Sequence, residues 1–396
     1  SCILNACCGM GDIDKGKQIH DEIIRTGLLK KNNSMLGNAL VDMYAKCGAP
    51  TKAQDILDEL TMRNIVSWNA LILGYSKLGK VRRALACFCR MQTECLFPNE
   101  VTFTCILKAC GMRGAIDKGK KIHDEIIIRD LLEKSPLLGT ALVDMYAKCG
   151  VLEKAQEVLN DLSVRDVISW SALIVGYTQY GKGHEALKCF EQMQKEGLAP
   201  DTISFICVLK ACAKIGAIEK GKQIHKEIKD RGLLGKDTNL GASLVDMYAK
   251  CGMLAKAQEV FDDLLVRNVV SWSSLIVGYA EEKKGREALQ CLEGMRNEGI
   301  FPDAVCLLCI LMTCSDIGAI DNGKEIHIEI MSRGLLEKDS VLGNALVDMY
   351  AKIGVLGKAQ EMFDDLLVRD VVSWSALIAG YVQQGEDYEA LKWFQC

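Results

Sequence analysis

The sequence is poor in proline and in long apolar stretches, and it carries no excess of positive charge. Only five of its 396 residues are proline, which suits a mostly helical chain. No run approaches the roughly 18 consecutive apolar residues that a membrane span needs, so we expect no membrane-spanning segment and no membrane partner. The net charge of −4 argues against a protein that holds nucleic acid mainly by bulk positive charge.

Motifs that would mark an enzyme or a metal protein are also missing. There is no G-x-x-x-x-G-K-[ST] phosphate loop and no nucleophile elbow. The C-L-L-C from Cys306 to Cys309 lacks a second pair at zinc spacing and lies in an apolar helical stretch. We therefore predict no enzymatic activity, no catalytic residue, no metal and no cofactor for this chain.

Histidines that precede an acid by two residues stand at His20, His123, His225 and His327. An H-x-E of this kind would mark a zinc deaminase only with a following P-C-x-x-C, which the sequence does not contain. Recurrence at a regular spacing favours a structural role in four equivalent helices over four catalytic centres. The nineteen cysteines lie within apolar helical patterns, so we expect buried, reduced thiols rather than a disulfide framework.

A repeat of 102 residues organises the chain. "DMYAKCG" occupies residues 42–48, 144–150 and 246–252, and it returns as "DMYAKIG" at 348–354. Tryptophans follow the same period at Trp68, Trp170, Trp272 and Trp374. Within the first copy, Leu40, Met43, Tyr44 and Cys47 have the i, i+3, i+4, i+7 spacing of a packed helix face. Because the fourth copy replaces the cysteine by isoleucine, a shared metal or redox role for it is disfavoured.

Each 102-residue block divides into three repeats of 31, 35 and 36 residues, and each repeat predicts two short helices. One pair cannot bury its own apolar faces, so neighbouring pairs must stack around one continuous core. We predict an all-α solenoid. The predicted repeats are 1–33 (partial), 34–64, 65–99, 100–135, 136–166, 167–201, 202–237, 238–268, 269–303, 304–339, 340–370 and 371–396 (partial).

Unequal helix pairs fit poorly to tetratricopeptide repeats, whose length is uniform at about 34 residues. They closely resemble the PLS class of plant pentatricopeptide repeat (PPR) proteins along essentially the whole chain. "NALVDMYAKCG" with "KAQDILDEL" resembles the short (S) motif, "VVSWSSLIVGY" with "MRNEGIFPD" the standard (P) motif, and "VLKACAKIGAIEKGKQIHKEI" the long (L) motif. The resemblance implies a right-handed superhelical α-solenoid that binds single-stranded RNA, one base per P or S repeat.

The resemblance assigns base recognition to the fifth and last residues of each P or S repeat. These are Asn38 with Asn64, Asn69 with Asn99, Thr140 with Asp166, Ser171 with Asp201, Ser273 with Asp303, Asn344 with Asp370, the closing Asn268, and Ser375 in the partial last repeat. Ala242 departs from the pattern because it has no polar group to pair with Asn268. The alternative is that the fifth residue is a solvated helix site and the last one caps the next helix.

Two further rows follow from the same helix face. Residues that would sandwich neighbouring bases are Met35, Val66, Leu137, Ile168, Val270, Val341 and Val372; ordinary packing at the start of the helix is the alternative. Lysines that could contact phosphate are Lys46, Lys148, Lys250 and Lys352. For these the alternative is a surface pair such as Lys46 with Asp42, worth about 0.2 to 0.5 kcal/mol.

With the RNA parallel to the chain, the resemblance implies the target Y-Y-n-G-G-n-n-G-n-U, where the long repeats read little. It also implies a site recognition factor for C-to-U RNA editing in a chloroplast or mitochondrion. Its partners would be single-stranded RNA, multiple organellar RNA editing factors, and a DYW-type deaminase in a C-terminal domain or a separate protein. The chain begins and ends inside a repeat, so we expect it to be a piece of a longer array. The rival hypothesis is a scaffold whose groove accepts a protein or peptide.

Overall fold

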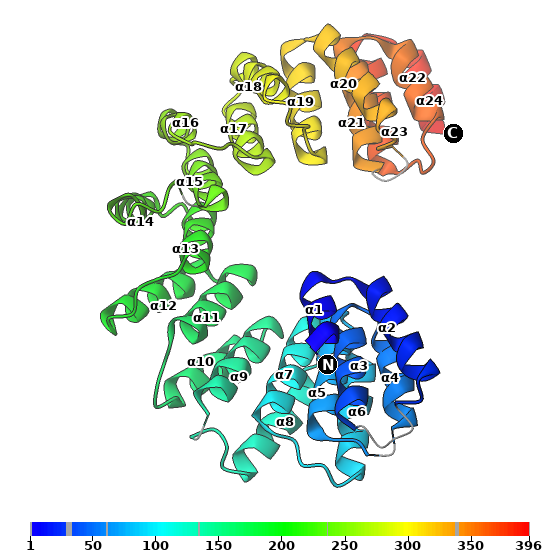
Figure 1. The fold of residues 1–396 in the computed structure, drawn as a ribbon. Helices are drawn as coiled ribbons and strands as arrows, with labels where there is room; N and C mark the ends of the chain where they lie inside the picture. The colour runs from blue at the N-terminus through cyan, green and yellow to red at the C-terminus, as the bar shows by residue number, and fades with distance from the viewer. Residues whose placement is uncertain are drawn as a thin grey trace. The chain divides into compact units, whose positions relative to one another are not determined.

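The computed structural model describes residues 2–28, 34–60, 62–133, 135–235, 237–336 and 340–395. Over these residues it has twenty-four α-helices and no strand, and the helices follow one another as pairs (Figure 1). The predicted all-α repeat solenoid is therefore confirmed. The chain divides into two compact parts, an N-terminal part of residues 1–208 and a C-terminal part of residues 209–396. The predicted repeat ends at residues 33 and 339 lie outside the described ranges.

In the N-terminal part, the first helices of the pairs are α1 (Cys2–Met10), α3 (Ser34–Lys46), α5 (Ile65–Lys77), α7 (Glu100–Arg113), α9 (Pro136–Lys148), α11 (Val167–Gln179) and α13 (Thr202–Ile215), which crosses the boundary. The second helices are α2 (Ile13–Arg25), α4 (Pro50–Glu59), α6 (Val81–Thr93), α8 (Ile116–Ile128), α10 (Leu152–Asp161) and α12 (Gly183–Lys195). In the C-terminal part, the first helices are α15 (Thr238–Lys250), α17 (Val269–Glu281), α19 (Ala304–Ile317), α21 (Ser340–Ile353) and α23 (Val371–Gln383). The second helices there are α14 (Ile218–Asp230), α16 (Leu254–Asp262), α18 (Gly285–Asn297), α20 (Ile320–Ser332), α22 (Leu356–Asp364) and α24 (Asp387–Gln395).

First helices pack side by side within each part. In the N-terminal part α3, α5, α7, α9 and α11 contact one another in that order, and in the C-terminal part α15, α17, α19, α21 and α23 do the same. The second helices α2, α4, α6, α8, α10, α16, α18, α20 and α22 each pack on the first helix of their own pair and on the next first helix. Equivalent positions of successive first helices therefore lie next to one another, which is the arrangement that a repeated binding surface needs.

Glycine allows the first helices of S and P repeats to approach closely. A Cβ on Gly176 of α11 would lie 2.8 Å from the Cβ of Ala147 on α9, and one on Gly278 of α17 would lie 2.9 Å from the Cβ of Ala249 on α15. Because real Cβ atoms essentially never come this close, only glycine fits at these places. The glycine of the "GY" motif in a P repeat thus packs against the alanine of the "YAK" motif in the preceding S repeat.

The repeated heptapeptide is explained by packing. Leu40, Met43 and Tyr44 are at most 2% exposed, as the helix pattern predicts, and Cys47 is half-buried. Met43 lies against Gly16 of the preceding second helix, where a Cβ would meet its sulfur at 2.5 Å. The hydroxyl of Tyr44 hydrogen-bonds to Nδ1 of His20 at 3.1 Å. The same bond recurs between His123 and Tyr146, His225 and Tyr248, and His327 and Tyr350.

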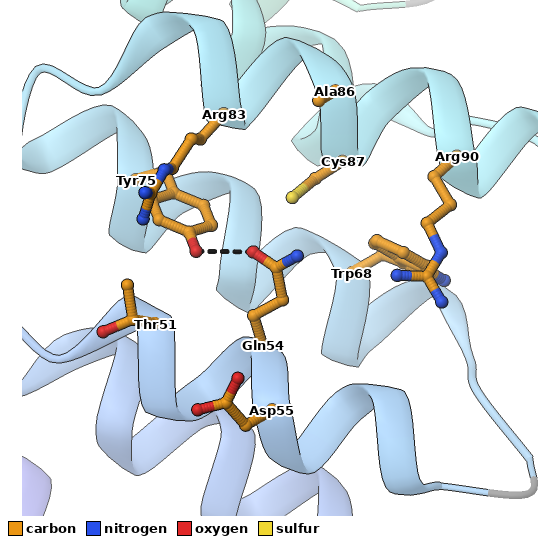
Figure 2. A pocket seen from close by; sticks show the side chains of 9 residues that line it. All are labelled: Thr51, Gln54, Asp55, Trp68, Tyr75, Arg83, Ala86, Cys87 and Arg90. Carbon is orange, nitrogen blue, oxygen red and sulfur yellow. Dashed lines mark hydrogen bonds between the residues drawn. The ribbon is translucent and has the colours of Figure 1, made fainter.

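A carboxylate holds the first three S–P junctions on the side of the second helices. Glu94 after α6 accepts from the indole N–H of Trp68 at 3.3 Å and from Arg63 at 2.7 Å. Trp170 with Arg165 on Glu196, and Trp272 with Arg267 on Glu298, repeat this arrangement. Nearby, the hydroxyl of Tyr75 on α5 donates to Gln54 on α4 at 2.5 Å (Figure 2). These contacts hold the second helices against the first helices. They do not involve the opposite side of the first helices, which stays available to bind a ligand.

Cysteines of the described residues are free thiols, mostly buried or half-buried. Burial raises the pKa of Cys87, Cys189 and Cys212 to about 12, so these thiols stay protonated at neutral pH. Cys306 is buried and Cys309 is half-buried, and no group of three metal-ligating side chains occurs in the described part of the chain. None of the described helices has the length and apolarity to cross a membrane.

Candidate nucleic-acid interface

The residue that closes each P or S repeat is positioned by the start of the next first helix. At five of these residues the side chain accepts a hydrogen bond from the backbone N–H of N3, the third residue of the helix. The hydroxyl of N3 in turn accepts from the backbone N–H of the closing residue. The five are Asn64, Asn99, Asp166, Asn268 and Asp370. Asp201 and Asp303 accept the equivalent N–H from Ser204 and Cys306. The capping role considered from the sequence is therefore real at all seven complete repeats. It fixes the side-chain oxygen Oδ1 of each closing residue.

The fifth residue of the same repeat lies beside this cap, because adjacent first helices are in contact. Ser171 Oγ lies 3.1 Å from Asp201 Oδ1, and Asn69 donates to Asn99 Oδ1 at 3.1 Å. The amide of Asn344 donates to both oxygens of Asp370, at 3.1 and 3.0 Å. Thr140 approaches Asp166 at 3.5 Å, at the limit of a hydrogen bond. The structure thus joins four of the predicted pairs directly.

Two predicted pairs and the two single residues are arranged differently. Asn38 makes no hydrogen bond to Asn64 in the described structure, and its Oδ1 is buried without a partner. Ser273 donates to the carbonyl of Val269 at 2.7 Å rather than to Asp303. Ala242 is buried, so its repeat presents only Asn268, which caps α17. Ser375 is exposed near the start of α23.

A third polar residue joins the pair in P repeats, and the sequence did not indicate it. The hydroxyl of Thr102 donates to Oδ1 of Asn69 at 2.6 Å. Ser204 Oγ lies 2.7 Å from both Ser171 Oγ and Asp201 Oδ1. In the P repeat 269–303, Cys306 occupies the position equivalent to Thr102 and Ser204. Its thiol lies 2.9 Å from Ser273 Oγ. The sequence feature that could have identified this third residue is its constant separation of 33 residues from the fifth residue of the repeat.

Aliphatic side chains at the second position project into solvent. The seven predicted residues are between 52% exposed, at Leu137, and 73% exposed, at Met35. Val101, Ile203 and Val305 of the long repeats are exposed in the same way. Packing at the start of the helix, the alternative considered for this row, is therefore wrong. The first helices that carry these ten residues therefore present an uncovered apolar group one turn before the fifth residue, whereas α15 has the polar Asn239 at this place.

The predicted phosphate-contacting lysines form ion pairs along their own helices. Lys46 with Asp42, Lys148 with Asp144, Lys250 with Asp246 and Lys352 with Asp348 have N–O distances between 2.6 and 2.9 Å. These are the surface pairs considered from the sequence, and each lysine keeps a partly exposed side chain. Because such pairs contribute little in water, they leave the lysines able to bind another anion.

Electrostatics at the closing residue Asp370 favour an ionised carboxylate. At Asp370, hydrogen bonds from the backbone N–H of Ser373 and from the Asn344 amide lower the pKa of the carboxyl. An ionised carboxylate can only accept hydrogen bonds, whereas the asparagine at the same place in other repeats also donates. The hydrogen-bonding character of the closing residue therefore differs between repeats, while the capping geometry stays the same.

Sequence models of known families match most of the chain, although residues 301–343 lie outside every match. The model described as "PPR repeat" matches residues 1–28, 38–65, 101–131, 140–167, 203–233, 243–269, 270–300, 344–371 and 372–396, and that described as "PPR repeat family" matches 63–112 and 165–214. The chain belongs to the pentatricopeptide repeat family. Every match is to a repeat, so the matched chain is an array of PPR repeats and not a catalytic domain.

Relatives of known sequence come from Arabidopsis thaliana. A putative pentatricopeptide repeat-containing protein is 35% identical over 99% of this chain and 57% of its own length. A pentatricopeptide repeat-containing protein named as mitochondrial is 34% identical over 99% of this chain and 56% of its length, and one named as chloroplastic is 32% identical over 99% and 62%. The chain therefore spans about three-fifths of the length of these relatives.

Solved structures of PPR10 share the fold. PPR10 in complex with an 18-nt psaJ RNA element superposes with a TM-score of 0.77 at 18% identity, covering 93% of this chain and 56% of that one. PPR10 from maize gives a TM-score of 0.66 at 18% identity, covering 99% and 67%. The likeness shows that this chain shares the fold of these structures.

Proposed function

We propose that this PPR array binds single-stranded RNA in a sequence-selective manner. The observation that carries the proposal is the pair formed by the fifth and closing residues, such as Ser171 with Asp201, which recurs at adjacent first helices. Exposed aliphatic residues beside each pair can pack on the faces of unstacked bases. The fold match to a PPR protein solved with RNA supports the same function.

Capping decides which atom the closing residue offers to a base. Oδ1 of Asp201 accepts the N–H of Ser204, so Oδ2 is left to accept a hydrogen bond. Oδ1 of Asn64 likewise accepts from Ser67, which leaves the Nδ2 amide to donate. An aspartate therefore suits a base with a ring N–H on its Watson–Crick edge, guanine or uracil. An asparagine suits a base with a ring nitrogen acceptor, cytosine or adenine.

This logic supports the family's code at each repeat. Serine or threonine with aspartate, as at Thr140, Ser171 and Ser273, selects guanine, and Asn344 with Asp370 selects uracil. The two asparagine pairs select pyrimidines, with cytosine the better match to a donor amide. Together they give Y-Y-n-G-G-n-n-G-n-U for RNA running parallel to the chain. We also propose that the chain is of the PLS class, in which L, S and P repeats alternate. This alternation decides which repeats read a base in this target sequence.

The wider role that fits a PLS array is recognition of sites for C-to-U RNA editing in an organelle. The relatives named as mitochondrial or chloroplastic support an organellar setting. In this role the deamination itself belongs to a DYW-type domain or a partner, and multiple organellar RNA editing factors bind the array. The exposed lysines Lys46, Lys148, Lys250 and Lys352 contact phosphates.

Selection from a random single-stranded RNA pool tests the proposal. The expected product carries guanines at the fourth and fifth positions of the motif, and enrichment without this step would refute the assignment. A filter-binding titration at two salt concentrations separates the rival function. Failure to bind RNA even at low salt would favour a peptide-binding scaffold, because the phosphate contribution is then largest.

A further inference from the structure

A cleft of about 810 Å³ lies where the turn between α5 and α6 meets the turn between α7 and α8. Its charged lining is entirely cationic: Lys80, Arg82, Arg83, Arg113 and Lys118. We call it the Arg113 pocket. The chain as a whole has a net charge of −4, so five cations around one cleft with no lining carboxylate make this region far more positive than the rest. Such a cleft raises the local concentration of anions.

In the described structure the cations of the Arg113 pocket form no ion pair with a neighbouring acid, although Arg83 also lines the adjacent cleft that contains Asp55 (Figure 2). Within the described ranges, none of the five has a carboxylate oxygen within 4.0 Å, although many other surface lysines and arginines do. Arg113 donates from Nε to the carbonyl of Gly79 at 2.9 Å, which holds its guanidinium at the cleft and leaves the two terminal nitrogens available. Arg83 extends from α6 beside the ring of Tyr75 (Figure 2).

The equivalent place in the third triplet has a different character. There the cleft is about 340 Å³ and its lining includes Lys283, Asp316 and Ile317. Ile317 stands where the first triplet has Arg113, and Gly285 replaces Val81. In the second triplet the residue matching Arg113 is Ile215, and Arg83 is matched by Glu185 there and by Glu287 in the third. The basic pocket is therefore a property of the first triplet and not of the repeat itself.

The pocket lies beyond the C-terminal end of α5, the helix that carries the proposed reading residue Asn69. Asn69, Leu73 and Lys77 follow one another at i, i+4 and i+8 on α5, so they lie on one face. Lys77 is exposed at the end of that helix, about 12 Å along the axis from Asn69. The pocket begins two residues later at Gly79. A contact between the pocket and bound RNA requires that a nucleotide whose base meets Asn69 directs its sugar and phosphate towards this end of the helix.

We propose that the Arg113 pocket binds a phosphate of the RNA backbone, next to the base read by Asn69 and Asn99. The inference rests on the proposed RNA binding and adds a contact outside the repeated code. Arginine pairs with phosphate through two parallel hydrogen bonds, and the lysines add charge. The pocket fixes where the RNA enters the register without selecting a base, since phosphate contacts position the chain and carry no sequence information.

The variant Arg83→Glu/Arg113→Ile tests this, because both new residues occur naturally at the matching positions of the other triplets. Lys284→Ile/Arg286→Glu is the matched control, since it removes the same charge from the same edge of the third triplet. Loss of one or two phosphate contacts should make the plot of log K against log[KCl] shallower by about 0.7 to 1.4 in the pocket variant only. Base preference in the selected pool should not change.

A single neutral methylphosphonate linkage, moved along the RNA, locates the contact. It should weaken wild-type binding most at the linkage 3′ of the second pyrimidine and have no such maximum with the pocket variant. Equal salt slopes for wild type and pocket variant would overturn the inference while RNA binding by the wild type stands. No binding of RNA by the wild type would instead overturn the proposed function.

Inorganic phosphate separates an RNA contact from a site for a free phosphate compound. At constant ionic strength, phosphate should raise the unfolding midpoint of the wild type and not that of the pocket variant. Stabilisation by phosphate together with an unchanged RNA salt slope would mean that the pocket serves a small phosphorylated ligand, which also overturns the assignment to RNA. Similar midpoints of the two variants in chloride would establish that both fold normally.

Discussion

Ser171 Oγ and Asp201 Oδ1 lie 3.1 Å apart, although 30 residues separate them in the chain. The serine is in the second turn of α11 and the aspartate caps α13, so the contact spans two neighbouring first helices. It uses one carboxylate oxygen for the fold and leaves the other for a ligand. This division lets the same residue be tested separately for structure and for recognition.

Asp201→Asn should move the preferred base at its repeat from guanine towards adenine. Asparagine keeps the capping oxygen but replaces the free acceptor by a donor, which matches the ring nitrogen of adenine. We expect a shift worth about 1 to 3 kcal/mol per base, measured by competition between RNAs that differ at that position. Asp117→Asn on α8, which removes a charge without touching the groove, is the control, and an unchanged preference in Asp201→Asn would refute the reading role.

Ser204→Ala should weaken binding to RNA with guanine at that base without changing which base is preferred. The serine hydroxyl lies 2.7 Å from both members of the pair, so its loss frees them to move. Removal of one buried hydrogen bond also costs about 1 kcal/mol of unfolding free energy. Ser204→Thr, which restores the hydroxyl, should recover affinity. If alanine and threonine bind RNA alike, the third residue does not position the pair.

Lys148→Ala should reduce the salt dependence of RNA binding by about one phosphate contact, a change of about 0.7 in slope. Its ion pair with Asp144 contributes only about 0.2 to 0.5 kcal/mol to an isolated helix, so the unfolding midpoint should barely move. Lys154→Ala removes a lysine that is paired with Glu157 on a second helix and serves as the control. Identical slopes for both variants would leave Lys148 as a surface pair only.

Gly176→Ala should destabilise the fold by about 1 to 3 kcal/mol. The added methyl group would lie 2.8 Å from the Cβ of Ala147 and 3.0 Å from Leu152, where α9 and α11 touch. Gly357→Ala is the matched control, because it meets nothing within 4 Å and lies in α22. Helix propensity predicts that this control stabilises by up to about 1 kcal/mol. Chemical unfolding of both variants checks the opposite signs.

Lowering the pH below about 6.5 should destabilise the folded chain through the four recurring histidines. Burial lowers the pKa of His20, His123, His225 and His327, so the unfolded chain binds more protons than the folded one in this range. Stability is then present above the ordinary histidine pKa and is lost as pH falls towards the folded value. Replacement of all four by glutamine should flatten the unfolding midpoint between pH 7.5 and 5.5. An equally steep fall in that variant would assign the effect to other groups.

The sequence predicts the fold well because each helix pair is a local unit. The 102-residue period, the packed stripe of Trp68, Leu71, Ile72 and Tyr75, and the turn at Gly48 all depend on residues close in the chain. The sequence could not decide whether Asn99 caps a helix or faces a base, since both roles use the same side chain. The structure shows the cap, with one side-chain group left over, and the reading role stays a prediction.

Relations between repeats were harder to predict than those within a repeat. Thr102 and Ser204 look like ordinary cap residues until the neighbouring helix places their hydroxyls on the fifth residue of the previous repeat. Likewise, Arg83 and Arg113 come from different repeats and share a cleft only once the turns meet. Sequence periodicity reveals what the copies of a repeat share. It therefore misses a feature, such as the Arg113 pocket, that occurs in one triplet alone.

The shared use of the closing residue has an evolutionary consequence. Asparagine and aspartate are almost equally good at capping a helix, so exchange between them leaves the array folded. A single nucleotide substitution in the gene converts an aspartate codon to an asparagine codon. Under the proposed code, each repeat can therefore acquire a new target base without passing through an unfolded intermediate. The products of duplicated genes can then adapt to a changing RNA site one base at a time.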